Sequence, residues 1–443
     1  MTNKKYFFIG IGGIGMSSIA QYLYEKGNTI LGYDASENRS VKILVKKGVE
    51  VINKLSLERI PDYMKEEDVI VVYTPAIPDD NIFLKYFRSN GNNPIFKRSE
   101  ILGEISKQSK CIAVAGTHGK TTTTAIISHL FHSSGIHFKA FIGGIMKCFD
   151  SNYINTGNDY IIVEADEYDR SFLNLNANYA VITSIENDHL DIYGDFKSLT
   201  ESFQSFANNV KDVLITDAEI KLDKDFSFSI KNDSDYCVDN IDILENEIRF
   251  DFKTPNNFYS NISANIVGLH NLKNVLAALS IIDQIKEIDI QNLLPFLSNF
   301  KGIERRMDIY KLDNKVVIDD YAHHPTEIES VLNTIQTNYK NKSKAVVFQP
   351  HLFSRTRDFM DEFATVLSKF DEVYLLDIYP AREKPIIGVS SQILLEKINC
   401  SKKELIDIKS IDNIVLNSKI EVISILGAGN ISENFNKQIF QNV

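Results

Sequence analysis

The sequence predicts an α/β protein made of three successive domains, each built on a mostly parallel sheet. Apolar, strand-like runs alternate with helix-like runs over most of the 443 residues, which is typical of parallel strands connected by helices. Two of the runs end in glycine-rich turns, within "FFIGIGGIG" and "AVAGTHGKT". A chain of this length exceeds one compact core, and ordinary domain sizes give about three domains.

The alternation falls into three sets, which define the expected domains 1–107, 108–300 and 301–443. The second set begins with "CIAVAGTHGKTTTT" and contains a polar, irregular stretch at about 217–261, which we expect to be rich in short β-strands. The third set begins near "GIERRMDIY" and repeats the alternation. Its expected strands are "KVVIDDY", "KAVVFQPH", "EVYLLDIY" and "EVISILGAG".

Composition narrows the class of protein. Hydrophobic residues make up 44% and charged residues 24%, as in an ordinary globular enzyme, and no apolar run is long enough for a membrane span. The start "MTNKKYFFIGIGG" lacks a secretory cleavage site, so we expect a cytoplasmic protein without membrane insertion. A net charge of -11 argues against a nucleic-acid partner. The cysteines have no metal-type spacing and read as reduced thiols: Cys111, Cys148, Cys237 and Cys400.

The first glycine turn, Gly10 to Gly15, predicts a nucleotide site. The run Tyr6 to Ile9 supplies a strand before it, and Met16 to Lys26 supplies a helix after it. Asp34 ends a second strand, where an acid that binds a ribose is expected. Such a turn recognises a phosphate, so the nucleotide itself stays open, and glycine turns without ligands also occur.

The second glycine turn, in "AVAGTHGKTTTT" (residues 113–124), carries the strongest signal. A buried strand breaks at Gly116, and a helix starts after Gly119, so that backbone amides face an anion. Lys120 is placed to reach the outer phosphates, and the Thr121 hydroxyl is a ligand for magnesium. Val114 stands where the usual pattern has glycine or alanine, so this is the shorter form of the loop. We expect ATP binding here, against the alternative of a fortuitous glycine turn.

Acidic residues gather where another apolar strand ends, in "YIIVEADEYDRSF". They are Glu164, Asp166, Glu167 and Asp169. A solvated loop is one interpretation, but a strand aimed at the acids favours metal ligation at the sheet edge where open α/β sheets bind ligands. A further strand leads to His189, which is either a ligand or a helix cap. Oxygen donors with an imidazole suit magnesium or manganese bridging ATP phosphates.

Taken together, the ordered motifs resemble the Mur ligases, the ATP-dependent amide-forming family of peptidoglycan assembly. In chain order these motifs are GIGGIGMS, GTHGKTTT, EADEYDRSF, the Asp188-His189 segment, GLHNLKN, GIERRMD, DDYAHHPTE and QPHLFSRTRD. They cover nearly the whole chain, and they are most similar to the branch that adds L-alanine. The resemblance implies a Rossmann-like N-terminal domain for a UDP-sugar, a central P-loop ATPase-like domain, and a C-terminal Rossmann-like domain that holds the amino acid.

The resemblance also implies roles for individual residues. For the UDP-sugar these are Gly12, Gly13, Ile14, Gly15, Asp34, Thr74 and Arg98. For ATP they are Gly116, Thr117, His118, Gly119, Lys120, Thr121, Thr122, His270, Asn271, Asn274 and Arg306. For the amino acid and the muramyl end they are His323, His324, His351, Arg355 and Arg357. The implied catalytic residues are Lys120, Glu164, His189, Arg306 and Asp320, and the implied ligands of Mg²⁺, with Mn²⁺ as an alternative, are Thr121, Glu164 and His189.

Two positions depart from the family pattern. Several sibling ligases carry a carbamylated lysine shortly after the histidine equivalent to His189, and Gln204 stands there in this chain. The alanine-adding branch generally lacks that lysine, so its absence agrees with the assignment. Near the C-terminus, Asn430 stands where the family commonly has aspartate, which argues against a charge-dependent role at that position.

The function implied by the resemblance is ATP-dependent joining of L-alanine to the lactyl carboxylate of UDP-N-acetylmuramate through an acyl phosphate. This reaction serves cytoplasmic peptidoglycan precursor synthesis, and thereby cell shape and division, and we expect a monomer or weak homodimer. The nearest rival is a murein tripeptide recycling ligase acting on the same UDP-sugar. Rivals of other classes are a nicotinamide-dependent oxidoreductase and a non-catalytic nucleotide switch. ATP hydrolysis that requires both L-alanine and UDP-N-acetylmuramate would exclude the last two.

Overall fold

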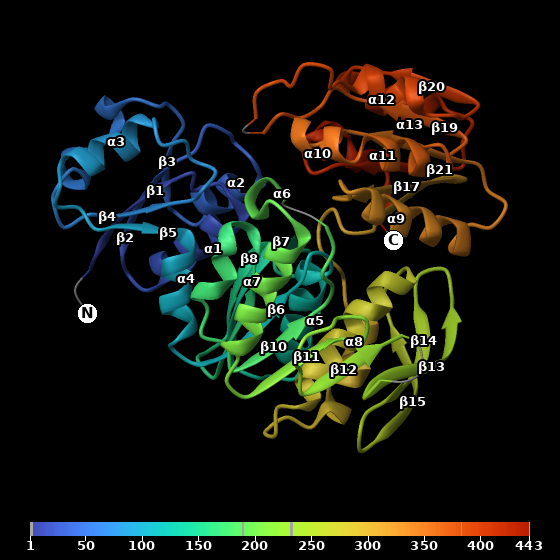
Figure 1. The fold of residues 1–443 in the computed structure, drawn as a ribbon, viewed down its shortest axis with the longest axis horizontal. Helices are drawn as coiled ribbons and strands as arrows, with labels where there is room; N and C mark the ends of the chain where they lie inside the picture. The colour runs from blue at the N-terminus through green and yellow to red at the C-terminus, as the bar shows by residue number, and fades with distance from the viewer. Residues whose placement is uncertain (1–2, 188–189, 231–233, 382, 443) are drawn as a thin grey trace. The chain divides into compact units, whose positions relative to one another are not determined.

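The computed structural model of the chain describes residues 3–187, 190–230, 234–381 and 383–442. Within them the strands form three sheets (Figure 1). The chain divides into two compact units, which are described separately. The first unit comprises Met1–Asp239, Asp251–Ile262 and Lys273–Lys301, and the second comprises Asn240–Phe250, Ser263–Leu272 and Gly302–Val443.

The first sheet has the strand order β3-β2-β1-β4-β5, and all of its pairs are parallel. Its strands are β1 (Lys5–Ile9), β2 (Thr29–Tyr33), β3 (Glu50–Ile52), β4 (Ile70–Tyr73) and β5 (Ile95–Lys97). Its helices are α1 (Ile14–Glu25), α2 (Arg39–Lys46), α3 (Ile82–Ser89) and α4 (Arg98–Ser106). The strand order reverses between β1 and β4, which is where an open α/β sheet forms its ligand crevice. The first glycine turn follows β1 at this point.

The second sheet has ten strands in the order β15-β14-β13-β12-β11-β10-β6-β9-β7-β8. The strands are β6 (Lys110–Ala115), β7 (Phe138–Met146), β8 (Ser151–Asn155), β9 (Tyr160–Glu164), β10 (Tyr179–Ile182), β11 (Val213–Asp217), β12 (Phe226–Ser229), β13 (Tyr236–Ile243), β14 (Ile248–Lys253) and β15 (Phe258–Ala264). The helices are α5 (Lys120–Ser133), α6 (Leu190–Tyr193), α7 (Phe196–Asn208) and α8 (Leu269–Asp283). Strands β12 to β15 account for the stretch expected to be rich in short strands.

Strand β6 lies in the middle of the parallel part of this sheet, between β9 and β10. Its residues from Cys111 to Ala115 are all buried, as expected for a strand covered on both faces. The carboxyl ends of β6, β9 and β10 therefore meet at one edge, and the loops that follow them carry the predicted ATP site.

The third sheet lies in the second unit and has the order β20-β19-β18-β21-β17-β16-β22. Its strands are β16 (Asp308–Leu312), β17 (Lys315–Asp320), β18 (Lys344–Phe348), β19 (Glu372–Leu375), β20 (Lys402–Leu405), β21 (Val422–Leu426) and β22 (Gln441–Asn442). Its helices are α9 (Pro325–Asn338), α10 (Phe353–Asp358), α11 (Met360–Leu367), α12 (Ser391–Lys397) and α13 (Ile411–Asn417). The four expected strands are present, and β16 and β22 add antiparallel pairs at one side.

Helix α1 joins the first sheet to the second within the first unit. The ring of Tyr22 packs 5.7 Å from that of Phe141 in β7 and 6.1 Å from that of Tyr153 in β8. Gln21 Nε2 donates to Asn152 Oδ1 at 2.8 Å, and Asn152 Nδ2 donates to the Ile14 carbonyl at 2.6 Å. The first two expected domains thus share a core, and their boundary after residue 107 stays a prediction. Among the described residues, no helix combines the length and apolar character that crossing a membrane requires.

Candidate active site

The phosphate loop connects β6 to α5 and depends on two glycines. Gly116 has φ +129° and Gly119 has φ +84°, which are backbone conformations that residues with a side chain rarely adopt. A Cβ at Gly116 would lie 2.9 Å from the Ser184 amide nitrogen, and one at Gly119 would collide with Asn274 Oδ1. The local backbone therefore requires glycine at both positions, as the sequence motif indicates.

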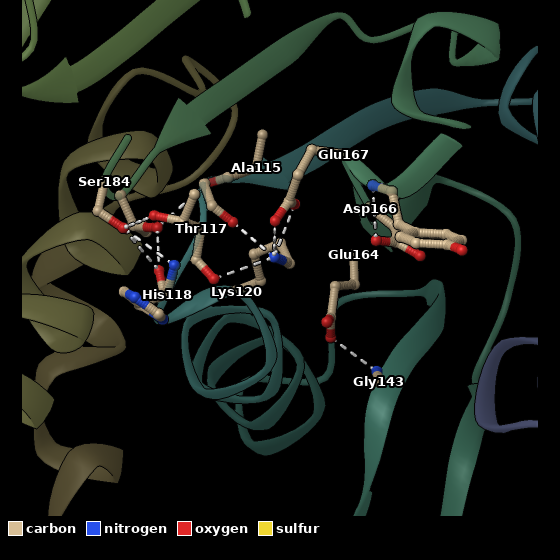
Figure 2. A network of polar contacts seen from close by, with 12 residues as sticks. Ala115, Thr117, His118, Lys120, Gly143, Glu164, Asp166, Glu167 and Ser184 are labelled. Atoms are coloured by element: carbon tan, nitrogen blue, oxygen red, sulfur yellow. Dashed lines mark hydrogen bonds and ion pairs between the residues drawn. The ribbon is translucent and has the colours of Figure 1, made fainter. Parts of the chain in front are cut away.

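Residues after β10 hold this loop in place (Figure 2). The Thr117 amide donates to the Ser184 carbonyl at 3.0 Å, and the His118 amide donates to Ser184 Oγ at 2.9 Å. The Thr183 hydroxyl donates to the His118 carbonyl. The loop is thus ordered by its neighbours at the N-terminus of α5, where helix amides and the helix dipole favour an anion.

Lys120 begins α5 and forms an ion pair with a fully buried carboxylate. Its Nζ lies 2.7 Å from Glu167 Oε2 and 3.0 Å from Oε1, and it donates to the Gly116 carbonyl at 2.6 Å (Figure 2). Burial opposes the charge of the ammonium, but Glu167, Asp166 and Glu164 outweigh it and raise the pKa of Lys120 above its ordinary value. Lys120 is therefore a cation in the loop.

Thr121 and Glu164, two of the predicted metal ligands, are neighbours. The Thr121 hydroxyl donates to Glu164 Oε1 at 3.1 Å, and the Gly143 amide donates to Glu164 Oε2 at 2.7 Å (Figure 2). A hydroxyl and a carboxylate are the hard oxygen donors that Mg²⁺ prefers, so this pair fits the ion. His189, the third predicted ligand, lies outside the described residues. Across the parts of the chain that are described, no three His, Cys, Asp or Glu side chains group as a metal site.

The other acids after β9 form ion pairs with the start of α4. Asp166 Oδ2 lies 3.0 Å from Arg98 Nη2, and Asp169 Oδ2 lies 2.8 Å from Lys97 Nζ. Sequence reasoning grouped these acids as metal candidates, and the structure gives them separate cationic partners. No local sequence signal joins residues so far apart along the chain.

The first glycine turn is shaped by packing inside its own domain. The Gly12 amide donates to Asp34 Oδ2 at 2.8 Å, and the Ser36 amide donates to Asp34 Oδ1 at 3.0 Å. A Cβ at Gly12 would lie 2.7 Å from Val41 Cγ2, and one at Gly15 would lie 2.8 Å from Arg98 Nη1. Asp34 and Arg98, both predicted for the UDP-sugar, therefore contact the turn itself.

The remaining predicted residues of the first unit lie near these two turns. Thr74 follows β4, and its carbonyl accepts from the Ile77 amide at 2.9 Å. A Cβ at Gly13 would meet only the Gly10 carbonyl, at 3.4 Å, and Met16. Thr122 is buried in the first turn of α5.

Helix α8 carries the residues predicted for adenine. Asn274 belongs to the first unit, where its side chain borders Gly119 and its carbonyl accepts from Thr123 Oγ1 at 3.4 Å. His270 and Asn271 belong to the second unit, where Asn271 Nδ2 donates to the Val267 carbonyl at 2.9 Å. Burial, reinforced by the charge of Arg306, lowers the pKa of His270 to about 4.

Asp320 ends β17 in the second unit as a buried carboxyl. The Met307 amide donates to its Oδ2 at 2.6 Å, and the Ala322 amide donates to its Oδ1 at 2.8 Å. Burial raises the pKa of Asp320 to about 6, although Arg306 and the two amides oppose this shift. Arg306 Nη1 lies 3.9 Å from Glu327 Oε1.

The predicted histidines follow β17 and β18, and two of them are neighbours. His323 Nδ1 lies 2.9 Å from the Tyr321 carbonyl and 3.2 Å from Glu327 Oε2. The ring of His351 lies 6.0 Å from that of His323 and stacks on Tyr379 at 5.6 Å.

The other predicted residues of this region have different surroundings. His324 is the N-cap of α9, and its ring packs 4.5 Å from that of Phe359. Arg355 is buried on α10. Arg357 pairs with Asp358 at 2.7 Å, with its side chain 54% exposed.

Arg305 is a residue of this region that sequence reasoning missed. It has φ +60°, and its guanidinium donates to the carbonyls of Gly427 and Gly429 in the turn after β21. In the same turn, Asn430 Oδ1 accepts a hydrogen bond from Gln349 Nε2 at 3.3 Å. The motif GIERRMD contains both Arg305 and Arg306, and nothing local in the sequence distinguishes the two arginines.

Comparison with known proteins identifies the family. The chain matches the family models described as "Mur ligase family, catalytic domain" over residues 5–110, "Mur ligase middle domain" over 114–282 and "Mur ligase, glutamate ligase domain" over 305–424. A protein of Christiangramia forsetii named UDP-N-acetylmuramate--L-alanine ligase is 44% identical over 98% of this chain and 96% of its own. The chain belongs to the Mur ligase family.

Solved structures agree with this Mur ligase fold. A UDP-N-acetylmuramate-alanine ligase of Thermotoga maritima superimposes with a TM-score of 0.84, at 29% identity over 97% of each chain. A murein peptide ligase of Psychrobacter arcticus has the same fold, with a TM-score of 0.72 at 21% identity over 98% of this chain and 97% of its own. The resemblance to Mur ligases and the three-domain α/β fold class are therefore confirmed. Family membership supports a ligase over the oxidoreductase and the nucleotide switch.

Proposed function

We propose that this Mur ligase joins L-alanine to the lactyl carboxylate of UDP-N-acetylmuramate at the expense of ATP, in peptidoglycan precursor synthesis. The observation that carries the proposal is the similarity over nearly the full length to proteins named UDP-N-acetylmuramate--L-alanine ligase, at 38–44% identity. The fold alone does not separate this activity from peptide recycling, because the murein peptide ligase shares it.

The phosphate loop is the proposed ATP site. Residues Gly116 to Thr122 supply the amides and the cation, and Asn274 borders the loop. Thr121 and Glu164 would hold Mg²⁺, with His189 as a further proposed ligand. The ion would supply positive charge against the phosphates where the phosphoryl group is transferred.

The reaction needs an activated carboxylate, because a carboxylate oxygen is a poor leaving group. The lactyl carboxylate attacks the γ-phosphorus of ATP, which releases ADP and forms an acyl phosphate. Lys120 stabilises the negative charge that develops on the transferred phosphoryl group. The amine of L-alanine then attacks the acyl carbon, and phosphate leaves.

The second unit supplies the proposed site for the amino acid. The attacking amine loses a proton, and His323 is the proposed acceptor, since Glu327 and the Tyr321 carbonyl orient its imidazole. His351, Arg355 and Arg306 would bind the amino acid, the muramyl end or the nucleotide, and Asp320 would orient the segment that carries Arg306.

The first glycine turn is the proposed site for the diphosphate of the UDP-sugar. It lies where the strand order reverses between β1 and β4, and backbone amides there recognise a pyrophosphate. The other strong motifs serve ligation, and none offers hydride chemistry. Residence in the cytoplasm and a monomeric or weakly dimeric state stay predictions.

Phosphate release tests the proposal. The enzyme is assayed with ATP, Mg²⁺ and UDP-N-acetylmuramate, and with L-alanine, glycine, L-serine or a murein tripeptide as acceptor. We expect turnover that requires both the UDP-sugar and L-alanine. Preference for the tripeptide would assign the enzyme to recycling, and hydrolysis that needs neither substrate would contradict a ligase.

A further inference from the structure

Glu167 engages the lysine of the phosphate loop more fully than the other acids do. A lysine ammonium has three donors, and those of Lys120 are shared among four acceptors: the Gly116 carbonyl at 2.6 Å, the Thr117 carbonyl at 3.3 Å, and the two carboxylate oxygens of Glu167 at 2.7 and 3.0 Å. The Glu167 side chain is 0% exposed, and that of Lys120 is 13% exposed. A phosphate oxygen can therefore reach this ammonium only by displacing one of these acceptors.

The backbone of Glu167 is fixed independently of Lys120. Its carbonyl accepts from the Tyr193 hydroxyl at 2.6 Å and from the Arg170 amide at 2.9 Å. Asp169 and Arg170 adopt left-handed conformations, with φ 53° and 54°, which turn the chain sharply after Glu167. The Arg170 guanidinium lies 4.8 Å from the centre of the Tyr193 ring. These contacts hold the Glu167 carboxylate close to the loop.

The charges around the phosphate loop disfavour the binding of a polyphosphate that carries no metal ion. Glu167 neutralises Lys120, and Glu164 brings a further carboxylate to the neighbouring Thr121. A phosphate that displaced Glu167 from Lys120 would leave a buried carboxylate without its cation, which is strongly unfavourable. A polyphosphate that carries a divalent cation has a smaller net charge and can use the oxygens of Glu164 and Thr121.

We infer that Glu167 is a positioning residue that makes nucleotide binding depend on the divalent cation. Its carboxylate pairs with Lys120, so that the lysine contributes to nucleotide binding only when the nucleotide arrives with its metal ion. This inference rests on the proposed function only in requiring that the loop binds nucleotide. It assigns Glu167 a role distinct from that proposed for Glu164, which would hold the metal ion.

Calorimetric titration of the full-length enzyme with ADP tests the inference, in buffer with Mg²⁺ and in buffer with EDTA. In EDTA we expect Glu167→Gln to bind ADP about tenfold more tightly than the wild type, which corresponds to about 1.4 kcal/mol. With Mg²⁺ the two should differ by less than about threefold, since the metal already compensates the charge. Asp166→Asn is the matched control, because it removes a nearby carboxylate that pairs with Arg98 instead.

An unchanged or weaker metal-free affinity in Glu167→Gln would overturn the inference, as would an equal gain in Asp166→Asn. Lys120→Gln provides a second test if Glu167→Gln does not fold, as judged by its thermal unfolding. Its affinity should fall with Mg²⁺ and stay nearly constant in EDTA, and an equal loss in both buffers would overturn the inference. If the wild type binds no ADP even with Mg²⁺, the proposed ATP site itself is wrong.

Discussion

The phosphate loop of the first unit and the histidine region of the second unit are built in different ways. The loop is one contiguous stretch after β6, and its geometry depends on backbone at Gly116 and Gly119 and on Ser184 beside it. The histidine region combines residues after β17 with residues after β18, and His323 is oriented through Glu327. A contiguous loop fixes each atom locally, whereas a dispersed site depends on ion pairs and packing. Substitutions should therefore affect the two regions differently.

The largest effect is expected at Lys120. Lys120→Ala removes the cation that is proposed to stabilise the transferred phosphoryl group, and we expect turnover to fall by about a thousandfold or more. Binding of UDP-N-acetylmuramate should be retained, because the proposed sugar site lies at the other glycine turn. Phosphate release measures the first effect and calorimetry the second. Lys110→Ala, at an exposed lysine paired with Glu287, is the control and should be active. Normal turnover in Lys120→Ala would contradict the loop assignment.

The next effect is expected at the proposed metal ligands. Glu164→Ala should raise the Mg²⁺ requirement or lower the rate by about a hundredfold, the scale of losing a preorganised charge contact. His189→Ala should act in the same direction. Magnesium titrations of the rate measure both effects. Asp169→Asn, which alters an acid paired with Lys97, is the comparison and should leave the titration unchanged. If both alanine variants showed the same magnesium titration as the wild type, neither residue would be a metal ligand.

A moderate effect is expected at the first glycine turn. Gly15→Val should push Arg98 away and raise the KM for UDP-N-acetylmuramate, with the KM for ATP nearly unchanged. Gly12→Val should also lower thermal stability, because its side chain meets Val41 and Asp34. Gly13→Ala, whose Cβ has room beside the Gly10 carbonyl, is the mildest change in the same turn and should alter both constants less than Gly12→Val or Gly15→Val. Steady-state kinetics measure the constants. Saturable NAD binding that neither UDP nor the UDP-sugar displaces would show that the turn serves another chemistry.

The smallest effect concerns the pH dependence of stability in the second unit. The pKa of Asp320 is raised to about 6 in the folded state, so the folded state binds more protons and the contribution of this group falls as pH rises from about 4 to 6. The pKa of His270 is lowered to about 4, so the unfolded state binds more protons and stability rises with pH between about 4 and 6.5. These two contributions oppose each other in the wild type.

Single variants should reveal the two slopes. Relative to the wild type, Asp320→Asn should gain stability as pH rises through this window, and His270→Gln should lose it, each by up to about 1.4 kcal/mol per pH unit. Thermal unfolding followed by circular dichroism at several pH values measures the difference. Parallel pH profiles for both variants and the wild type would contradict these shifts.

The same contrast explains what the sequence could predict. Gly116, Gly119, Lys120 and Thr121 occupy fixed places in a strand, turn and helix, so a local motif predicts their geometry. The partners of that motif, Ser184 and Glu167, come from other strand ends, and only the folded sheet brings them to the loop.

Elsewhere the prediction was coarser for physical reasons. The strands of the third domain were recognised from buried apolar runs, whereas β20, with four exposed residues, has no such pattern. The family resemblance assigned His323, His351 and Arg357 to the amino-acid region, but the sequence could not show that Arg357 pairs with Asp358. Rotamers and ion pairs decide such details, and they depend on residues distant in the chain.

The packing of α1 against β7 and β8 has a consequence for synthesis on the ribosome. Tyr22 finds its partners Phe141 and Tyr153 only in strands that are translated much later. When the first sheet has been made, Gln21 and Tyr22 still lack these partners from β7 and β8, and we expect this face of α1 to be exposed. The N-terminal domain can therefore complete its core only after the β7–β8 hairpin has been synthesised. A pause in translation before Tyr153 would prolong the exposure of that face and favour recruitment of a chaperone.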